Sequence, residues 1–346
     1  MPLEIPSVDP TPIFEIFRGN YATELLTAAV AHLHVFEVLD DRPMSIADLQ
    51  NRLGLADRPC HVLVTALCAF GMLRKQNDRL ELTGVAREHL LPGAPFDVSG
   101  YVGLAADNPG VREMVERLRS NRPAGEKPEE KGAAFIFREG ITSAMEEEAS
   151  ARHLTMALAG RANNVAPILA QRVKLDSARL LLDVGGGSGI YSIACLQQNP
   201  NLRAIVWDRP EVLKVAQELA ETHGVAERLE CRPGDMFRDP MPAGVDVILL
   251  SNVLHDWDVP ECRALIKRCA DGLPSGGRLL IHDVFLNDAL DGPLPITLYS
   301  AALFTLTEGR AYSALEYRTW LEEVGLTAKA IIPTLIHCGV LEGVRG

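Results

Sequence analysis

The sequence lacks several features that would point to a membrane, to nucleic acid or to secretion. No apolar run approaches the roughly 20 residues that a membrane-spanning helix needs. Lys and Arg number 34 against 46 Asp and Glu, and the net charge of −12 argues against nucleic acid and anionic membranes as partners. The first residues lack the basic and apolar regions of a signal peptide, so we expect no secretory leader.

Paired cysteines are missing as well. The chain has 7 cysteines, an odd number, and none forms a C-x-x-C pair, so the spacing offers no zinc site. Three of them fall in apolar helical patterns, namely Cys68, Cys195 and Cys269. We therefore expect free buried thiols, a reducing cytoplasmic environment and no bound metal.

What is present is enough apolar material for more than one domain, 47% of 346 residues. The patterns indicate a mainly helical part at 1–105, a helical linker and substrate-pocket segment at 106–175, and a part at 176–346 where strands alternate with helices. This alternation predicts an α/β fold with a doubly wound, mostly parallel, seven-stranded Rossmann-like sheet. The candidate strands are 179–184, 203–207, 229–232, 245–250, 278–285, 328–334 and 337–344.

The N-terminal part shows the helix, turn, helix and hairpin order of a winged helix. Ser45 caps a short helix, Arg58–Phe70 forms a second, and Asn77 and Asp78 turn the hairpin. Residues 1–100 hold 8 Lys and Arg against 13 Asp and Glu, an acidic balance that speaks against a DNA-reading surface. We interpret this part as a protein-interaction module.

Two further segments concern contacts with other molecules. Tyr21–Val38 has the apolar period of a long helix, and we expect it to pack against a second subunit. Residues 121–132 are charged and rich in Pro and Gly, which is typical of an exposed loop. The helical pattern after that loop carries apolar side chains that are candidates for the core or for the wall of a substrate pocket: Phe135, Met145 and Met156.

The most informative stretch runs from Asp183 to Gly189, where an apolar run ends in an acid and then in four glycines among five residues. Glycines at a strand end let backbone come close to a ligand, here at Gly185 and Gly187. Their G-x-G-x-G spacing differs from the G-x-G-x-x-G of dinucleotide folds. The acid Asp183 would repel a pyrophosphate but suits a ligand with an ammonium group.

Acids at the next strand ends complete a nucleoside site. Asp208 follows Asp183 by about 20 residues, where an acid accepts from both ribose hydroxyls. Asp235 is placed to accept from an adenine amino group, and Met236 to pack on the ring. An adenosine with a cationic, phosphate-free tail describes S-adenosylmethionine, which becomes S-adenosylhomocysteine after methyl transfer.

The fourth predicted strand ends in Ser251 and leads to His255, Asp256 and Trp257, near the same crevice. Histidine is the side chain whose ordinary pKa, ~6.5, makes it a base near neutral pH. A phenol, with a pKa of ~10, is a poor nucleophile until its proton is removed. Together these observations indicate methyl transfer to a hydroxyl of a small, aromatic acceptor with His255 as general base and no metal.

The glycine stretch and the acids lie in motifs that resemble the SAM-dependent O-methyltransferases of the caffeate, hydroxyindole and bacterial-antibiotic type. The motifs are Asp183–Gly189, Trp207–Pro210, Gly234–Phe237 and Asn252–Trp257. The resemblance implies a homodimer formed through the N-terminal winged-helix domain. It also implies that Gly185 contacts the cofactor, Asp208 its ribose, and Asp235 and Met236 its adenine, that Ser251 replaces a cofactor-contacting Lys, and that His255 is the base.

In that family two acids orient the histidine. One position falls at Asp283 and the other at Ala311, which cannot orient a ring, so Glu308 and Tyr312 are the candidates to replace it. Besides the Met and Phe residues above, we assign Asp256 and Phe304 to the substrate pocket.

Other readings of the same motifs stay open. The acceptor atom can be S, N or C, because a more nucleophilic acceptor needs less help from a base. A SAM-binding fold can also catalyse a reaction other than methylation, since fold does not fix function. A DNA-binding regulator that senses SAM is disfavoured by the acidic N-terminal part.

Overall fold

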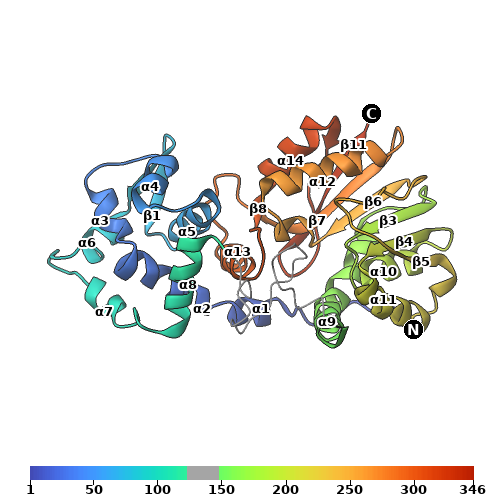
Figure 1. The fold of residues 1–346 in the computed structure, drawn as a ribbon, viewed down its shortest axis with the longest axis horizontal. Coiled ribbons are helices and arrows are strands. Elements are labelled where there is room, and N and C mark those ends of the chain that lie inside the picture. The colour runs from blue at the N-terminus through green and yellow to red at the C-terminus, as the bar shows by residue number, and fades with distance from the viewer. Residues whose placement is uncertain (123–147) are drawn as a thin grey trace.

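The computed structural model describes residues 1–122 and 148–346, and the structural statements below refer to these residues. They form a mainly helical N-terminal domain and a C-terminal α/β domain, which confirms the predicted fold class (Figure 1). The ribbon places α1 (Thr11–Phe17) and α13 (Leu294–Leu306) between the two domains, and α9 (Glu148–Arg172) beside α10 (Ile190–Gln198) and α11 (Pro210–Thr222) of the C-terminal domain. Within the described ranges, no helix is long and apolar enough to cross a bilayer.

The winged-helix order of the N-terminal domain is confirmed. Ser45 Oγ accepts from the Asp48 backbone N–H at 3.1 Å and so caps the fourth helix, which ends at Gly54 with φ +66°. The hairpin turns at Asn77 and Asp78, both with positive φ. The elements are α2 (Asn20–Thr27), η1 (Ala28–His32), α3 (Val35–Asp40), α4 (Ile46–Leu53), α5 (Asp57–Ala69), β1 (Leu73–Gln76), β2 (Arg79–Leu82), α6 (Gly84–His89), α7 (Ser99–Gly103) and α8 (Pro109–Ser120).

The prediction of one long helix at Tyr21–Val38 is wrong. The chain changes from α2 to the π-turn η1 and then breaks at His34, whose φ is +52°, before α3 begins. The expected contact with a second subunit is also wrong for its apolar face, because residues such as Leu25, Ala29 and Val30 are buried in the core of their own domain.

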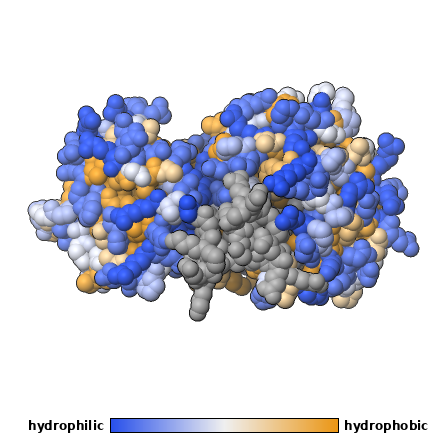
Figure 2. Space-filling model, in the orientation of Figure 1, coloured by the Kyte–Doolittle hydropathy of each residue, from blue (hydrophilic) through white to orange (hydrophobic). Residues whose placement is uncertain are grey.

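Exposed apolar side chains lie elsewhere on the N-terminal domain. Ile16 and Phe17 of α1 are 81% and 79% exposed, and Tyr101 and Leu104 at α7 are both 79% exposed. Figure 2 shows apolar residues gathered on the visible face of this domain. Such surfaces are typical of an interface with another protein.

The C-terminal sheet has nine strands in the described ranges, with the order β10-β11-β7-β6-β3-β4-β5, while β8 pairs with β7 and β9 with β11. The run β7 to β5 is parallel and β11 is antiparallel to β7. The strands are β3 (Leu180–Val184), β4 (Arg203–Asp208), β5 (Leu229–Pro233), β6 (Val247–Ser251), β7 (Arg278–Leu286), β8 (Tyr312–Ser313), β9 (Leu326–Ala328), β10 (Ile332–Pro333) and β11 (Cys338–Arg345).

Strand alternation explains the layers. On β3, Leu181 packs into a cluster with α9, α10 (Ile190–Gln198) and α11 (Pro210–Thr222), while its neighbour Leu182 packs against α12 (Val259–Gly272) and α14 (Ala314–Glu323). Apolar residues on both faces make the strand buried throughout. The predicted strand 328–334 is divided between β9 and β10, and the short strand β8 has no counterpart in the prediction.

Candidate active site

The glycine loop after β3 has the backbone geometry that glycine permits. Gly185, Gly187 and Gly189 have φ of +64°, +58° and +70°, a region that side chains with a Cβ disfavour. The Gly187 N–H donates to Asp208 Oδ2 at 2.8 Å, which joins the loop to the end of β4. A Cβ on Gly187 would meet nothing within 4 Å, so the space beside this peptide is open to a ligand.

Asp183 lies beneath this loop and is completely buried. Its Oδ2 accepts from Ser192 Oγ at 2.8 Å, but Oδ1 is buried without a hydrogen-bond partner among the described residues. Burial raises the pKa of Asp183 to about 7, although the Ser192 hydrogen bond opposes this. A Cβ on Gly186 would lie 2.6 Å from Asp183 Cγ, so glycine at this position lets the loop fold over the acid.

Asp235 and Met236 follow the end of β5, and Met236 faces the glycine loop. Met236 Sδ lies 4.0 Å from the position of a Cβ on Gly185, and Val253 Cγ2 lies 3.1 Å from the same position. Asp235 Oδ1 accepts from the Phe237 backbone N–H at 2.8 Å, which fixes the turn. The predicted cofactor residues Gly185, Gly187, Asp208 and Met236 are therefore brought together along the ends of neighbouring strands.

His255 lies in the 3₁₀ turn η3 (Leu254–Asp256) after β6 and is 4% exposed. Its Nδ1 donates to Asp283 Oδ1 at 2.6 Å. Asp283 is itself fixed, since Oδ1 also accepts from the Val284 N–H and Oδ2 accepts from the Tyr317 hydroxyl. With Nδ1 as the donor, Nε2 of the neutral ring carries the lone pair that can take a proton.

The charges around His255 set its basicity. Burial alone would lower the pKa of His255, but the carboxylates of Asp283 and Asp256 outweigh burial and raise it above its ordinary value. Asp256 Oδ1 lies 3.6 Å from Nε2, beyond a hydrogen bond, and burial raises the pKa of Asp256 to about 6. The two acids thus make the His255 ring more basic, and its Nε2 has no hydrogen-bond partner in the described residues.

Ser251, predicted to contact the cofactor, has its hydroxyl 2.8 Å from His282 Nδ1. The other ring nitrogen of His282 lies 3.2 Å from Thr334 Oγ1. Burial, aided by the charge of Arg161, lowers the pKa of His282 to about 3, so this ring is neutral. His282 was not singled out by the sequence, because a histidine inside a strand carries no motif.

The remaining predicted residues make other contacts. Glu308 donates through its backbone N–H to the Asp256 carbonyl at 3.2 Å, and the Tyr312 hydroxyl donates to the Trp257 carbonyl at 2.6 Å. Phe304 is completely buried in the core shared with the N-terminal domain, and Met156 is 44% exposed on α9. Phe135 and Met145 lie outside the described residues.

Two residues that the sequence did not assign to the site support the backbone of His255. A Cβ on Gly309 would lie 2.1 Å from the His255 carbonyl oxygen, so the loop at 307–309 rests directly on that backbone. Arg58 of the N-terminal domain donates to the Thr307 and Gly309 carbonyls at 2.7 and 3.2 Å. These contacts join residues 249 to 251 positions apart, and no local pattern reveals them.

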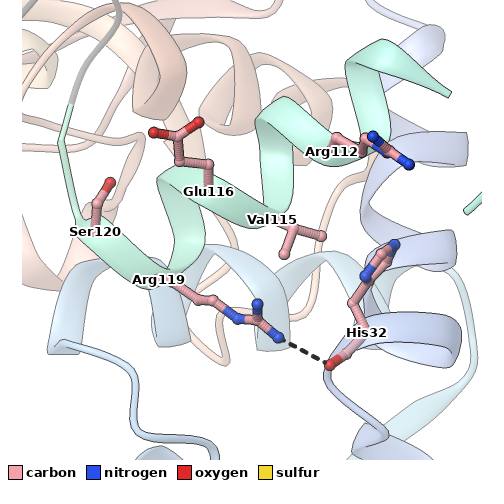
Figure 3. Close-up of a pocket in the computed structure, with 6 residues that line it drawn as sticks. All are labelled: His32, Arg112, Val115, Glu116, Arg119 and Ser120. Carbon is pink, nitrogen blue, oxygen red and sulfur yellow. Dashed lines mark hydrogen bonds between the residues drawn. The ribbon is translucent and has the colours of Figure 1, made fainter. Parts of the chain in front are cut away.

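A separate hollow of about 500 Å³ lies on the N-terminal domain, between α8 and η1 (Figure 3). One of its walls is held by Arg119, which donates to the His32 carbonyl at 3.3 Å. None of the predicted site residues lines it. Its lining residues are His32, Arg112, Val115, Glu116, Arg119 and Ser120. Within the described ranges, no group of three His, Cys, Asp or Glu side chains has the arrangement of a metal site.

A model of the O-methyltransferase domain matches residues 129–327, and a model of the O-methyltransferase dimerisation domain matches residues 14–91. The chain belongs to the O-methyltransferase family. It is therefore a SAM-dependent methyltransferase, and the resemblance seen in the sequence is confirmed.

Relatives of this methyltransferase span nearly the whole chain. The 3-hydroxy-5-methyl-1-naphthoate 3-O-methyltransferase of Streptomyces sahachiroi is 34% identical over 91% of this chain and 89% of its own length. The L-tyrosine C(3)-methyltransferase of Streptomyces lavendulae is 29% identical over 90% and 85%. A crystal structure of an O-methyltransferase family 2 protein from Planctomyces limnophilus, in complex with apigenin, has a TM-score of 0.90 at 50% identity and covers 99% of this chain and 98% of that one.

The residues of this methyltransferase fit the cofactor that the family uses. The orphaned, buried Oδ1 of Asp183 and the open space beside Gly187 are features that a bound nucleoside with an ammonium group would complete. Burial raises the pKa of Asp208, although hydrogen bonds from the backbone of Arg209 and Gly187 oppose this effect. The Asp208 carboxylate can still accept hydrogen bonds from a pair of hydroxyls.

Proposed function

We propose that this methyltransferase transfers a methyl group from S-adenosylmethionine to a hydroxyl of a small aromatic molecule, with His255 as general base. The observation that carries the proposal is the His255 ring, held at Nδ1 by Asp283 at 2.6 Å with Nε2 unoccupied. The cofactor, when bound, supplies an electrophilic methyl group on a sulfonium. The protein's own part is to orient the acceptor and take its proton.

The basicity of His255 suits this step. Asp283 fixes the ring so that the lone pair is on Nε2, and its negative charge stabilises the imidazolium that forms. A phenol with a pKa of ~10 becomes a competent nucleophile when its proton moves to that nitrogen during attack. The rest of the catalysis comes from positioning the reacting groups. A base whose ring is fixed within a buried hydrogen-bond network is well suited to this.

For the cofactor, we propose that Asp183, Gly185 and Gly187 hold the amino-acid end, Asp208 the ribose, and Asp235 and Met236 the adenine. Ser251 contributes from the end of β6. The shared position of these residues along the carboxyl ends of β3 to β6 supports the assignment, since ligands of open α/β sheets bind at that edge.

We also propose that the protein acts as a homodimer and that the N-terminal domain forms the interface. The match to the dimerisation-domain model and the exposed apolar side chains of α1 and α7 support this proposal. An aromatic acceptor is supported by the naphthoate named for one relative and by the apigenin bound to another.

The His255→Ala variant tests the proposed base. We expect turnover of a hydroxyarene acceptor to fall by at least ~10²-fold at neutral pH, while S-adenosylhomocysteine affinity measured by calorimetry stays close to that of the wild type. Unchanged turnover in the variant would refute the base assignment. Identifying the methylated atom of the product by NMR separates O-methylation from the carbon methylation named for the tyrosine relative.

A further inference from the structure

Two arginines converge on one tyrosine ring beside His255. The Arg18 guanidinium carbon lies 3.7 Å from the centre of the Tyr299 ring, and that of Arg161 lies 5.8 Å from it. The Tyr299 ring in turn meets the His255 ring edge to face, with 5.6 Å between their centres. Arg18 follows α1, Arg161 lies on α9 and Tyr299 on α13, and Figure 1 shows α1 lying between the other two helices.

Neither guanidinium is paired with a carboxylate in residues 1–122 and 148–346. Arg18 is 8% exposed, yet its contacts in this part of the chain are the rings of Phe14 and Tyr299. Arg161 donates to Asn252 Oδ1 at 2.9 Å and to Cys338 Sγ at 3.1 Å, and its Nε is buried without a partner. Both arginines thus keep unused capacity to donate hydrogen bonds.

Two other buried arginines of this protein are paired with acids, whereas Arg58 donates to Asn121 and to the Thr307 and Gly309 carbonyls. Arg310, 5% exposed, meets Glu316 at 2.6 Å, and Arg117, 7% exposed, meets Glu113 at 2.8 Å. The charge of Asp283 acts on Arg161, but that carboxylate already accepts hydrogen bonds from His255, Val284 and Tyr317. Tyr299, whose ring both guanidiniums approach, is neutral because burial raises its pKa to about 12.

Burying the Arg18 cation without an acid is costly, whereas the surroundings of Arg161, with Cys338 and Tyr299 first among them, outweigh burial and raise its pKa. Burial lowers the pKa of Arg18, and the positive charge of Arg161 adds to this effect while Tyr299 opposes it. A buried charge without a partner destabilises a folded protein, so such groups are retained where a ligand supplies the opposite charge. The planar fork of a guanidinium matches a carboxylate, which accepts two parallel hydrogen bonds.

We propose that Arg18 and Arg161 bind a carboxylate carried by the acceptor, so that the substrate class is hydroxyaryl carboxylic acids. This inference rests on the proposed function, because it places the acid group on the same molecule that gives its proton to His255. Tyr299 connects the proposed carboxylate site with the base. Both guanidiniums approach its ring, and the His255 ring packs against it edge to face.

The test compares hydroxybenzoic and hydroxynaphthoic acids with their carboxamides, which keep the hydroxyl and the shape but lose the charge. We expect the wild type to prefer the acids by at least about tenfold, in kcat/KM and in affinity for the S-adenosylhomocysteine complex, as a charged hydrogen-bonded pair provides. Arg18→Gln and Arg161→Gln should each remove most of this preference by weakening the acids alone. Arg18→Lys should keep part of it, and Arg74→Gln, at an exposed pair with Glu81, should leave it unchanged.

The outcomes separate the sources of the carboxylate. Equal affinity of the wild type for acids and amides would overturn the proposal. So would an Arg18→Gln or Arg161→Gln variant that binds S-adenosylhomocysteine at least about tenfold more weakly with the acid preference intact, since the guanidinium then serves the cofactor's own carboxylate. If the acids bind preferentially but no hydroxyl is methylated, the carboxylate site stands and the proposed function fails.

Discussion

His255 and His282 are both buried at the same end of the sheet, yet they have opposite electrostatic surroundings. His282 lies on β7 directly beside Ser251 of β6, and His255 follows that strand by a few residues. The pKa of His282 is lowered to about 3, whereas that of His255 lies above its ordinary value. Burial acts on both rings in the same direction, so the difference comes from their partners.

The partners differ in charge rather than in distance. His282 Nδ1 meets the neutral Ser251 hydroxyl at 2.8 Å, and His255 Nδ1 meets the Asp283 carboxylate at 2.6 Å. Asp283 follows His282 directly in the sequence, but strand alternation sends the two side chains to opposite faces of β7. A neutral hydrogen bond fixes a ring, while a carboxylate also makes it a base. The comparison teaches that burial alone does not identify a catalytic histidine.

The largest expected effect comes from altering the hydrogen-bond partner of each ring. Asp283→Asn should lower kcat by roughly 10²-fold or more, because the variant loses the charge that stabilises the imidazolium and the acceptor that selects the tautomer. Ser251→Ala, the matched change at His282, should alter S-adenosylhomocysteine affinity but leave the pH profile of kcat unchanged. Steady-state kinetics across pH check both. Equal losses in the two variants would erase the distinction between the histidines.

A smaller effect is expected from moving the His255 backbone alone. The Cβ of Gly309→Ala would lie 2.1 Å from the His255 carbonyl oxygen, so the 3₁₀ turn must shift. A displacement of about 1 Å at a catalytic group costs up to ~10²-fold, and we expect kcat to fall by about tenfold or more. Gly100→Ala is the control, since a Cβ there meets nothing within 4 Å. Kinetics indistinguishable from those of the control would show that the loop does not position the ring.

The smallest effect concerns the pH dependence. With His255 as the proposed base, only its neutral form is active, so kcat/KM should rise with pH through its pKa, which the carboxylates hold above the ordinary value. Asp256→Asn removes one of these charges and lowers the pKa, so the rising limb should move to lower pH. The profile measured between pH 5 and 9 reports this shift. A limb that stays in place would mean that Asp256 acts on substrate and not on the base.

Local sequence rules were sufficient for much of the fold. Ser45 and Gly54 bound their helix because a cap and a positive φ are properties of single residues. The hairpin at Asn77 follows from the same kind of rule. The prediction of one long helix at Tyr21–Val38 failed because the apolar period continues through His34, which takes a left-handed φ of +52° before α3 begins.

The candidate site divides in the same way. The glycine loop, Asp208 and His255 were predicted from the sequence because each follows the end of a strand, and parallel strands bring their ends to one edge. Arg18, Arg58, Arg161 and Tyr299 were not found, since they come from helices whose mutual position depends on packing between the domains.

By itself, therefore, the sequence determined the class of protein and its use of SAM, and it predicted the histidine, since these depend on strand order and on glycine's backbone freedom. Only the tertiary structure decided which acid holds His255, which of the two buried histidines lies beside carboxylates and where two arginines converge on one tyrosine ring. Those properties depend on distances and burial between residues far apart in the chain, and electrostatic energies change steeply with both.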